Sequence, residues 1–112
     1  MEIGLRYKGK KINLEVKKLG FFGRFMGLMF SRRENAEPLL FDFGKQTRIS
    51  IHSWFVFYPF LAVWTDKNNK TQEIRRIYSW NLSIKPKKSF VKLIEIPINR
   101  KYNKIVKLLD GD

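Results

Sequence analysis

The chain has 112 residues, of which 44% are hydrophobic and 15% aromatic, and this composition predicts one folded domain over residues 1–112 rather than a disordered segment. The absence of cysteine excludes disulfides, thiolate nucleophiles and cysteine-based metal sites, and a single histidine excludes a histidine-rich site, so we expect no metal and no cofactor. The N-terminal residues do not resemble a secretory signal, which predicts a cytoplasmic location.

The net charge is strongly positive, with 23 Lys and Arg against 10 Asp and Glu, or +13. Such a charge favours a polyanionic partner, either nucleic acid or an anionic lipid surface. The excess is spread evenly, because 11 basic and 5 acidic residues precede Phe57 and 12 and 5 follow from it. An A/T-rich coding sequence, which enriches Lys, Ile and Asn, would also explain the charge. Both explanations remain open.

The first third of the chain predicts strands around a short helix. Alternating apolar residues over Ile3–Tyr7 and Ile12–Val16, separated by a turn with Gly9, predict a β-hairpin. Large apolar residues between 20 and 33 recur at helical spacing and predict a short internal helix. Beyond Pro38, the segment LLFDFGKQTRISIH (39–52) predicts a strand, a glycine turn and a second strand.

The most apolar segment runs from Trp54 to Trp64, and its eleven residues are too few for a membrane-spanning helix, which needs about 20. Pro59 lacks a backbone donor, so we expect the strand to begin after it and to cover Phe60–Thr65. A polar turn at 66–70 then separates this strand from Thr71–Tyr78.

The C-terminal part predicts more extended chain and a final helix. Alternation at Trp80, Leu82 and Ile84 continues the extended structure, and Phe90–Ile96 predicts the last strand. Asn99 is a good N-cap for an amphipathic, basic helix over 100–109. The expected fold is mainly β (α+β): a small barrel or rolled antiparallel sheet with one short internal helix and a C-terminal helix.

Several segments, in this order, resemble a known but uncharacterised family. They are Gly27-Leu28-Met29-Phe30 with Arg32, Leu40-Phe41-Asp42-Phe43, Ile51-His52-Ser53-Trp54-Phe55 with Pro59-Phe60, Asp66, Trp80, Glu95-Ile96-Pro97 and Gly111-Asp112. The chain is similar over nearly its whole length to the domain of unknown function 192 family, also called uncharacterised protein family 0127. The resemblance implies a mainly β domain with no established catalytic residues, and relatives that are often exported or anchored. An acidic residue common in that family two positions after the proline is replaced here by Leu61.

Catalytic candidates are few. His52 is the one histidine, so any histidine-based acid–base scheme must run through it, with Glu95 or Asp42 as the carboxylate. The alternative for His52 is a hydrogen-bonded structural role. No nucleophile elbow or phosphate-binding glycine loop is present in the sequence.

Binding candidates are basic or aromatic. Arg32 and Arg33 could bind a phosphate or carboxylate through two hydrogen bonds from a guanidinium group. Alternatively, they lie at the C-terminus of a helix, where the helix dipole favours cations. The densest group of lysines, which is either a phosphate-binding edge or a solvated loop, comprises Lys85, Lys87, Lys88 and Lys92. Trp54 or Trp80 would stack on bases if exposed.

We therefore expect a non-catalytic module that binds an anionic partner, with nucleic acid favoured. The first alternative is an enzyme of unknown reaction that uses His52 with a carboxylate. The second is a structural or assembly protein, or one that contacts a membrane surface through the basic C-terminal helix.

Overall fold

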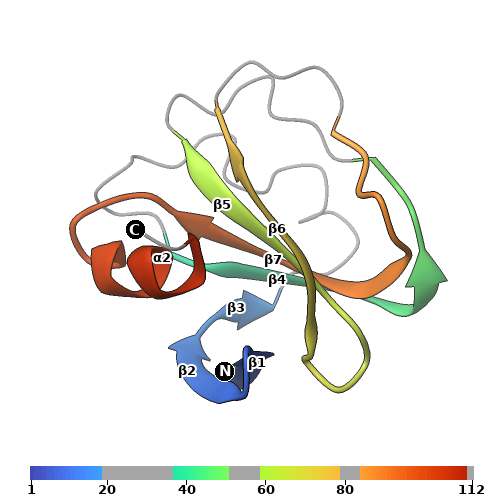
Figure 1. The fold of residues 1–112 in the computed structure, drawn as a ribbon, viewed down its shortest axis with the longest axis horizontal. Coiled ribbons are helices and arrows are strands. Elements are labelled where there is room, and N and C mark those ends of the chain that lie inside the picture. Colours follow the sequence, from blue (N-terminus) through green and yellow to red (C-terminus); the bar gives the residue numbers. More distant parts are fainter. Residues whose placement is uncertain (19–36, 51–58, 79–83, 111–112) are drawn as a thin grey trace.

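The computed structural model describes residues 1–18, 37–50, 59–78 and 84–110 (Figure 1). The expected internal helix lies outside these residues, as do most of the apolar segment before Pro59 and the segment around Trp80. The described elements are β1 (Glu2–Tyr7), β2 (Lys10–Glu15), β3 (Lys17–Lys18), β4 (Leu39–Thr47), β5 (Phe60–Thr65), β6 (Thr71–Ile77), β7 (Phe90–Pro97) and α2 (Asn103–Asp110).

The strands form two sheets, and the mainly β class with a C-terminal helix is confirmed. A two-stranded sheet pairs β1 with β2, and a five-stranded sheet has the order β3-β4-β7-β5-β6 (Figure 1). All neighbours are antiparallel except β3 and β4, which are parallel. Among the described strands the larger sheet is open and mostly antiparallel, so it does not form the closed barrel that was one of the two expected forms.

The N-terminal hairpin is confirmed, with Ile3 opposite Leu14 and Leu5 opposite Ile12. Both residues of its tight turn have positive φ, 49° at Lys8 and 75° at Gly9. Two-residue turns of this hand match the right-handed twist of the flanking strands, which explains why the chain reverses at the glycine.

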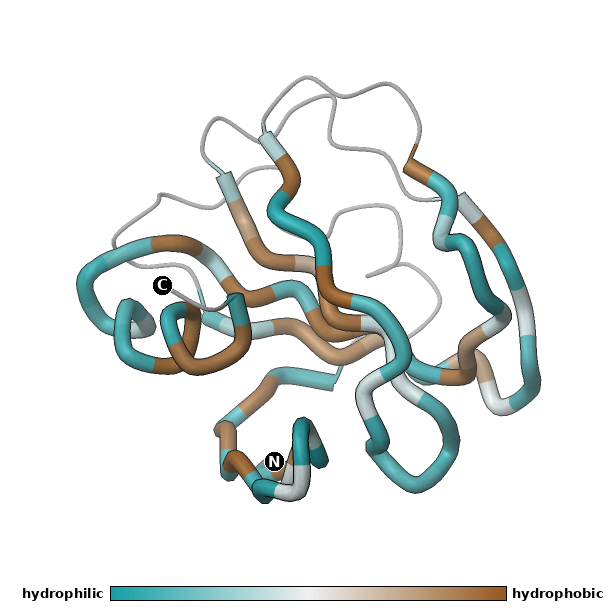
Figure 2. The backbone as a smooth tube through the Cα atoms, viewed as in Figure 1, coloured by the Kyte–Doolittle hydropathy of each residue, from teal (hydrophilic) through white to brown (hydrophobic). Residues whose placement is uncertain are grey.

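The five-stranded sheet is apolar on both faces. One face packs against the hairpin and α2, and this cluster includes Leu5, Leu61, Ile94, Ile96 and Val106. The opposite face carries a second cluster that includes Phe60, Ala62, Trp64, Phe90 and Leu93. β5 is therefore buried at all six of its residues. In Figure 2, the strands in the interior are largely brown, or hydrophobic, and the outer turns are largely teal, or hydrophilic.

Leu61 stands where the family that the sequence resembles commonly has an acidic residue. Its side chain is fully buried, at 0% exposure, among the apolar residues between the sheet, the hairpin and α2. A carboxylate at this position would be buried without a compensating charge in that cluster, so the leucine suits the packing of this chain.

The prediction of a glycine turn within residues 39–52 is wrong. β4 continues through Gly44 to Thr47, and the register against β7 shifts between Asp42 and Thr47, which marks a bulge. Gly44 has a φ of 72°, a conformation that glycine adopts at bulges without a steric penalty. The glycine therefore bends one strand instead of separating two.

The strand after Pro59 and the C-terminal helix are confirmed. β5 begins at Phe60, directly after the proline. Asn99 Oδ1 accepts a hydrogen bond from the Tyr102 backbone N–H at 3.1 Å, which stabilises the turn before the helix, and α2 begins at Asn103, three residues later than expected. Arg76 of β6 ties the helix to the sheet through hydrogen bonds of 3.0 and 2.7 Å to Asp110. No helix among the described residues is both long enough and apolar enough to cross a bilayer.

Candidate functional site

Three segments that are distant in the sequence meet at one end of the five-stranded sheet. Thr47 at the end of β4 is opposite Phe90, and Thr65 at the end of β5 is opposite Lys92. The start of β7 therefore lies between the end of β4 and the β5–β6 turn. A hydrogen bond of 3.1 Å from Ser89 Oγ to Gln46 Oε1 joins the first two segments.

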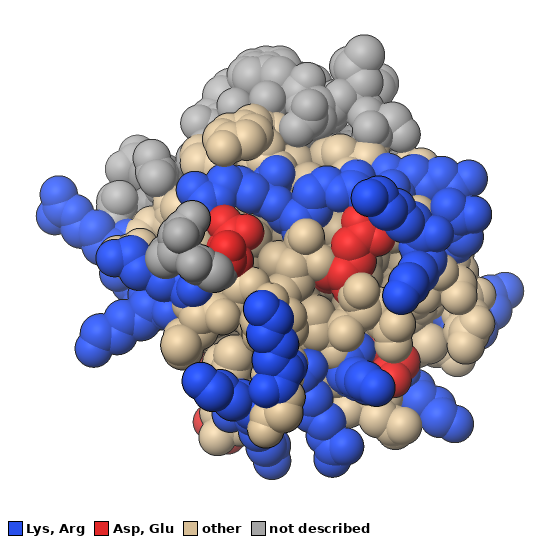
Figure 3. All heavy atoms as spheres, in the orientation of Figure 1, with Lys and Arg blue, Asp and Glu red and all other residues tan. Residues whose placement is uncertain are grey.

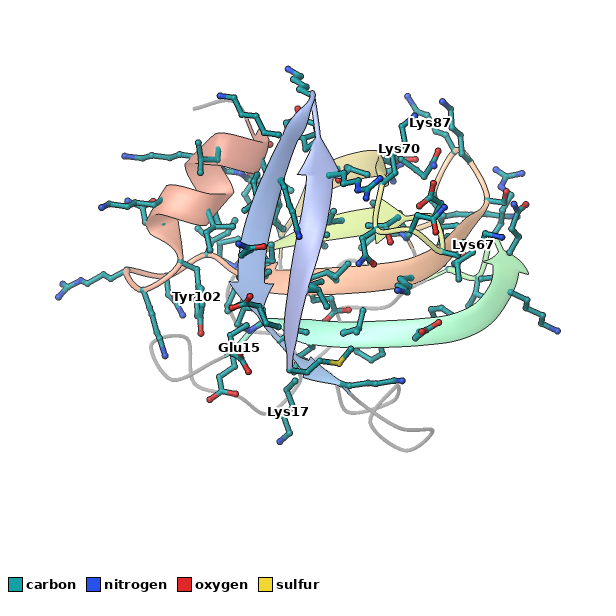
Figure 4. The ribbon with its side chains drawn as sticks, turned by 90° about the horizontal axis from the view of Figure 1, so that it is seen from below. Glu15, Lys17, Lys67, Lys70, Lys87 and Tyr102 are labelled. Atoms are coloured by element: carbon teal, nitrogen blue, oxygen red, sulfur yellow. The ribbon has the colours of Figure 1, made fainter. Side chains whose placement is uncertain are left out.

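We call this end of the sheet, with the exposed lysines of its three segments, the cationic end. It comprises six exposed lysines: Lys45, Lys67, Lys70, Lys85, Lys87 and Lys88. Figure 4 shows Lys67, Lys70 and Lys87 on the side of the molecule away from α2. In Figure 3, Lys and Arg are spread over the visible face among uncharged residues, and the areas of Asp and Glu between them are small. Other lysines lie on α2 and the hairpin, but the cationic end combines lysines from three separate segments.

The acidic groups at this end are used to hold the backbone. Asp66 Oδ1 accepts hydrogen bonds from the backbone N–H groups of Asn68 at 2.8 Å and Lys70 at 2.9 Å. Asp42 Oδ1 likewise accepts one from Gly44 at 2.9 Å. None of the six lysines forms an ion pair with another described residue. The charge of the lysines is therefore available to an external anion.

The β5–β6 turn has a local origin in its sequence, DKNNK. The carboxylate of Asp66 caps the turn by bonding backbone donors two and four residues ahead, as aspartate commonly does in turns. Asn69 adopts a φ of 65°, which asparagine tolerates better than most residues. This geometry directs two exposed lysines, Lys67 and Lys70, to the same end as the segment before β7.

A pocket of about 380 Å³ opens between these segments. It is lined by Gln46, Asp66, Gln72, Lys88, Ser89, Phe90 and Val91. Phe90 is buried, and its ring packs edge-to-face against Trp64 in the core at a centroid distance of 6.4 Å. The pocket therefore combines polar side chains from β4, the β5–β6 turn, β6 and the segment before β7 with a wall formed by the start of β7.

Glu73 connects the lysine segment to the sheet. Its carboxylate pairs with Arg75 and accepts a hydrogen bond of 2.8 Å from the Lys87 backbone N–H. The Arg75 guanidinium lies over the Trp64 ring, 5.5 Å from its centroid, which holds the pair against the core. Glu73 thus fixes the position of the Lys87 backbone, although its negative charge partly offsets the positive charge of the lysine.

We expect Glu73→Ala to free the segment around Lys87. Hydrogen exchange of the Lys87 amide, followed by NMR, should accelerate by at least about tenfold, because the loss of an acceptor worth about 1.5–3 kcal/mol leaves that donor open to water. Glu2→Ala, at an exposed position on β1, is the control and should leave this amide unchanged. Equal exchange rates in the parent protein and Glu73→Ala would contradict the positioning role.

Lys92 differs from the other predicted lysines. It is partly buried, and its Nζ donates a hydrogen bond of 2.9 Å to Asn69 Oδ1. It therefore braces the β5–β6 turn instead of extending into solvent.

Glu95 lies in the centre of the sheet, far in register from the cationic end. It is opposite Leu39 on β4 and Ala62 on β5, and it is 7% exposed. Desolvation by burial raises the pKa of this carboxyl to about 8, so it is protonated in the folded protein at neutral pH. No hydrogen bond links its side chain to another described residue, so the structure brings no acid–base partner to it from that part of the chain.

The remaining candidates cannot be placed. His52, Trp54, Arg32, Arg33 and Trp80 lie outside the described residues, so the acid–base and stacking hypotheses built on them stay predictions. In the described ranges, no three acidic or histidine side chains come together as a metal site would require.

Sequence reasoning identified Lys85, Lys87 and Lys88 but missed half of the cationic end. The sequence predicts only turns for the segments that contain Lys45, Lys67 and Lys70. The strand order brings these segments to the same end of the sheet as Lys85, Lys87 and Lys88. The polar residues that line the pocket, Gln46 and Gln72, carried no signal in the sequence.

Comparisons with protein-family models and with curated proteins gave no match. Two solved crystal structures share the fold. One is described as a putative transcription regulator from Sinorhizobium meliloti 1021, with a TM-score of 0.73, 18% sequence identity, and coverage of 91% of this chain and 81% of that chain. The other is a protein of unknown function from Novosphingobium aromaticivorans, with a TM-score of 0.73, 9% identity, and coverage of 93% and 76%. Identities this low show a shared fold and nothing further.

Proposed function

We propose that this chain is a non-catalytic module that binds nucleic acid through the cationic end. The supporting observation is that six exposed lysines from three segments lie at one end of the sheet, beside a pocket that Lys88 lines, while Asp66 and Asp42 accept hydrogen bonds from backbone N–H groups. Phosphate contacts of this kind supply most of the affinity for a nucleic acid and require no particular fold.

The neighbouring structure from Sinorhizobium meliloti supports a nucleic-acid partner weakly, through its description alone. A cytoplasmic location, expected from the sequence, would give the domain access to such a partner. Membership of the domain of unknown function 192 family stays a prediction, as does the enzymatic alternative through His52.

A salt titration tests the proposal. Binding of a fluorescently labelled single-stranded 12-mer should be measurable at about 50 mM salt, and the logarithm of its association constant should fall with log salt at a slope of about −4. Six phosphate contacts, each releasing about 0.7 of a counterion from a single strand, account for that value.

Two outcomes would remove the proposal. One is the absence of oligonucleotide binding at about 50 mM salt. The other is binding to vesicles of anionic phospholipid without binding to the oligonucleotide, which would favour a role at a membrane surface.

A further inference from the structure

The lining of the pocket carries both signs of charge. Lys88 contributes an ammonium group to it and Asp66 a carboxylate. One oxygen of that carboxylate accepts two backbone hydrogen bonds, and its Oδ2 forms none with another described residue. A phosphate placed beside this oxygen would be repelled, so the interior suits a neutral group that donates hydrogen bonds.

Two amides add to this lining. Gln46 Oε1 accepts the hydrogen bond from Ser89, so the amide NH₂ of Gln46 retains donors for another group. The Gln72 side chain forms no hydrogen bond with another described residue, and it can supply both a donor and an acceptor. The pocket therefore offers adjacent donors and acceptors, the pattern found on the edge of a nucleobase.

The size and position of the pocket limit how a base could enter. Its volume of about 380 Å³ lies near the lower end of the range for small-molecule sites. A base stacked and paired inside a duplex cannot reach such a pocket, whereas an unpaired base can. Lys88 lines the pocket and the exposed Lys67 directly follows Asp66, so both can contact phosphates beside an inserted base.

We infer that this pocket binds an unpaired nucleobase that carries an exocyclic amino group, of which cytosine is the smallest. This inference rests on the proposed function and specifies its ligand as a single strand. The cytosine N4 amino group donates to the Asp66 carboxylate, and the acceptors on the same base face the amide donors of Gln46 and Gln72. Uracil presents a carbonyl oxygen where cytosine presents that amino group. The Asp66 carboxylate would then have no donor from this position of the base, and two hydrogen-bond acceptors, the carboxylate and the carbonyl oxygen, would face each other.

Two single strands whose bases differ in this amino or carbonyl group, dC12 and dU12, test the inference. Fluorescence anisotropy should show dC12 binding about tenfold more tightly than dU12, because one well-formed base contact discriminates by about 1–3 kcal/mol. The salt slopes for the two strands should be equal, since their phosphates are the same.

The Asp66→Asn variant tests the role of the carboxylate. Its Oδ1 can still accept the hydrogen bonds from Asn68 and Lys70, so the turn is retained, while a donor replaces the free acceptor. The ratio of dC12 to dU12 affinity should fall to about one or lower. Glu2→Gln, which removes the same charge at an exposed position on β1, should keep the ratio of the parent protein.

The outcomes separate this inference from the proposed function. If the parent protein binds dC12 and dU12 equally with the expected salt slope, the base-binding pocket is wrong and the polyanion module stands. If Asp66→Asn folds and keeps the preference for dC12, the assigned contact is wrong. If neither strand binds, both the inference and the proposed function are overturned.

Discussion

Replacing Lys67, Lys87 and Lys88 together by Gln is expected to weaken binding of a single-stranded oligonucleotide by about two to three orders of magnitude at about 50 mM salt. Loss of three phosphate contacts should reduce the salt slope from about −4 to about −2, and the affinity difference follows from that change in slope. Titrations of the parent protein and the variant over several salt concentrations measure both quantities.

A matched variant controls for net charge. Lys101, Lys104 and Lys107 are exposed on and beside α2, away from the cationic end, and their replacement by Gln removes the same charge with residues that favour helix. This variant should keep the salt slope and lose less than about tenfold in affinity. Equal losses in the two variants would mean that total charge, and not the cationic end, controls binding, as the compositional explanation of the basic sequence requires.

The second large effect concerns the stability of the protein as a function of pH. The pKa of Glu95 is about 8 in the folded protein and lies near its ordinary value of 4.5 in the unfolded chain. Between these two pH values the folded state holds a proton that the unfolded state has released. The contribution of this carboxyl to the free energy of unfolding is therefore most favourable below about pH 4.5, falls as the pH rises, and levels off above about pH 8. The full loss is on the order of several kcal/mol.

Glu95→Gln should remove this dependence. Chemical denaturation at pH 5 and pH 8 should show that the variant loses several kcal/mol less stability than the parent protein over this interval, because a neutral amide replaces the titrating group. Glu2→Gln, at an exposed position on β1, is the control and should follow the parent protein. A constant difference in stability between Glu95→Gln and the parent protein at both pH values would show that Glu95 is already ionised in the fold.

Glu95 also illustrates how far the candidate site could be predicted. The sequence identified it as a carboxylate for acid–base chemistry, but its central position between Leu39 and Ala62 follows from the pairing of β7 with both β4 and β5. No periodicity in a single strand reveals which strands flank it. The burial that raises its pKa is accordingly a property of the sheet.

The sequence by itself determined the local elements of this protein. Alternation and the positive-φ turn at Lys8-Gly9 specify the hairpin, Pro59 sets the start of β5, and Asn99 caps the turn into the last helix. These features depend on neighbours within a few residues, so a single chain encodes them directly. The apolar character of β5 also follows from the sequence, since a strand covered on both faces needs no alternation.

Only the tertiary structure decided where these elements meet. Gly44, which in sequence is typical of a turn, became a bulge because β4 keeps its pairing with β7 on both sides of it. The cationic end exists because the strand order places the β5–β6 turn beside the start of β7. This brings Lys67 and Lys70 to the same end as Lys87, although they are 17 or more positions apart in the sequence. Pairing between distant strands is set by the burial of two sheet faces at once, and that requirement involves the whole chain.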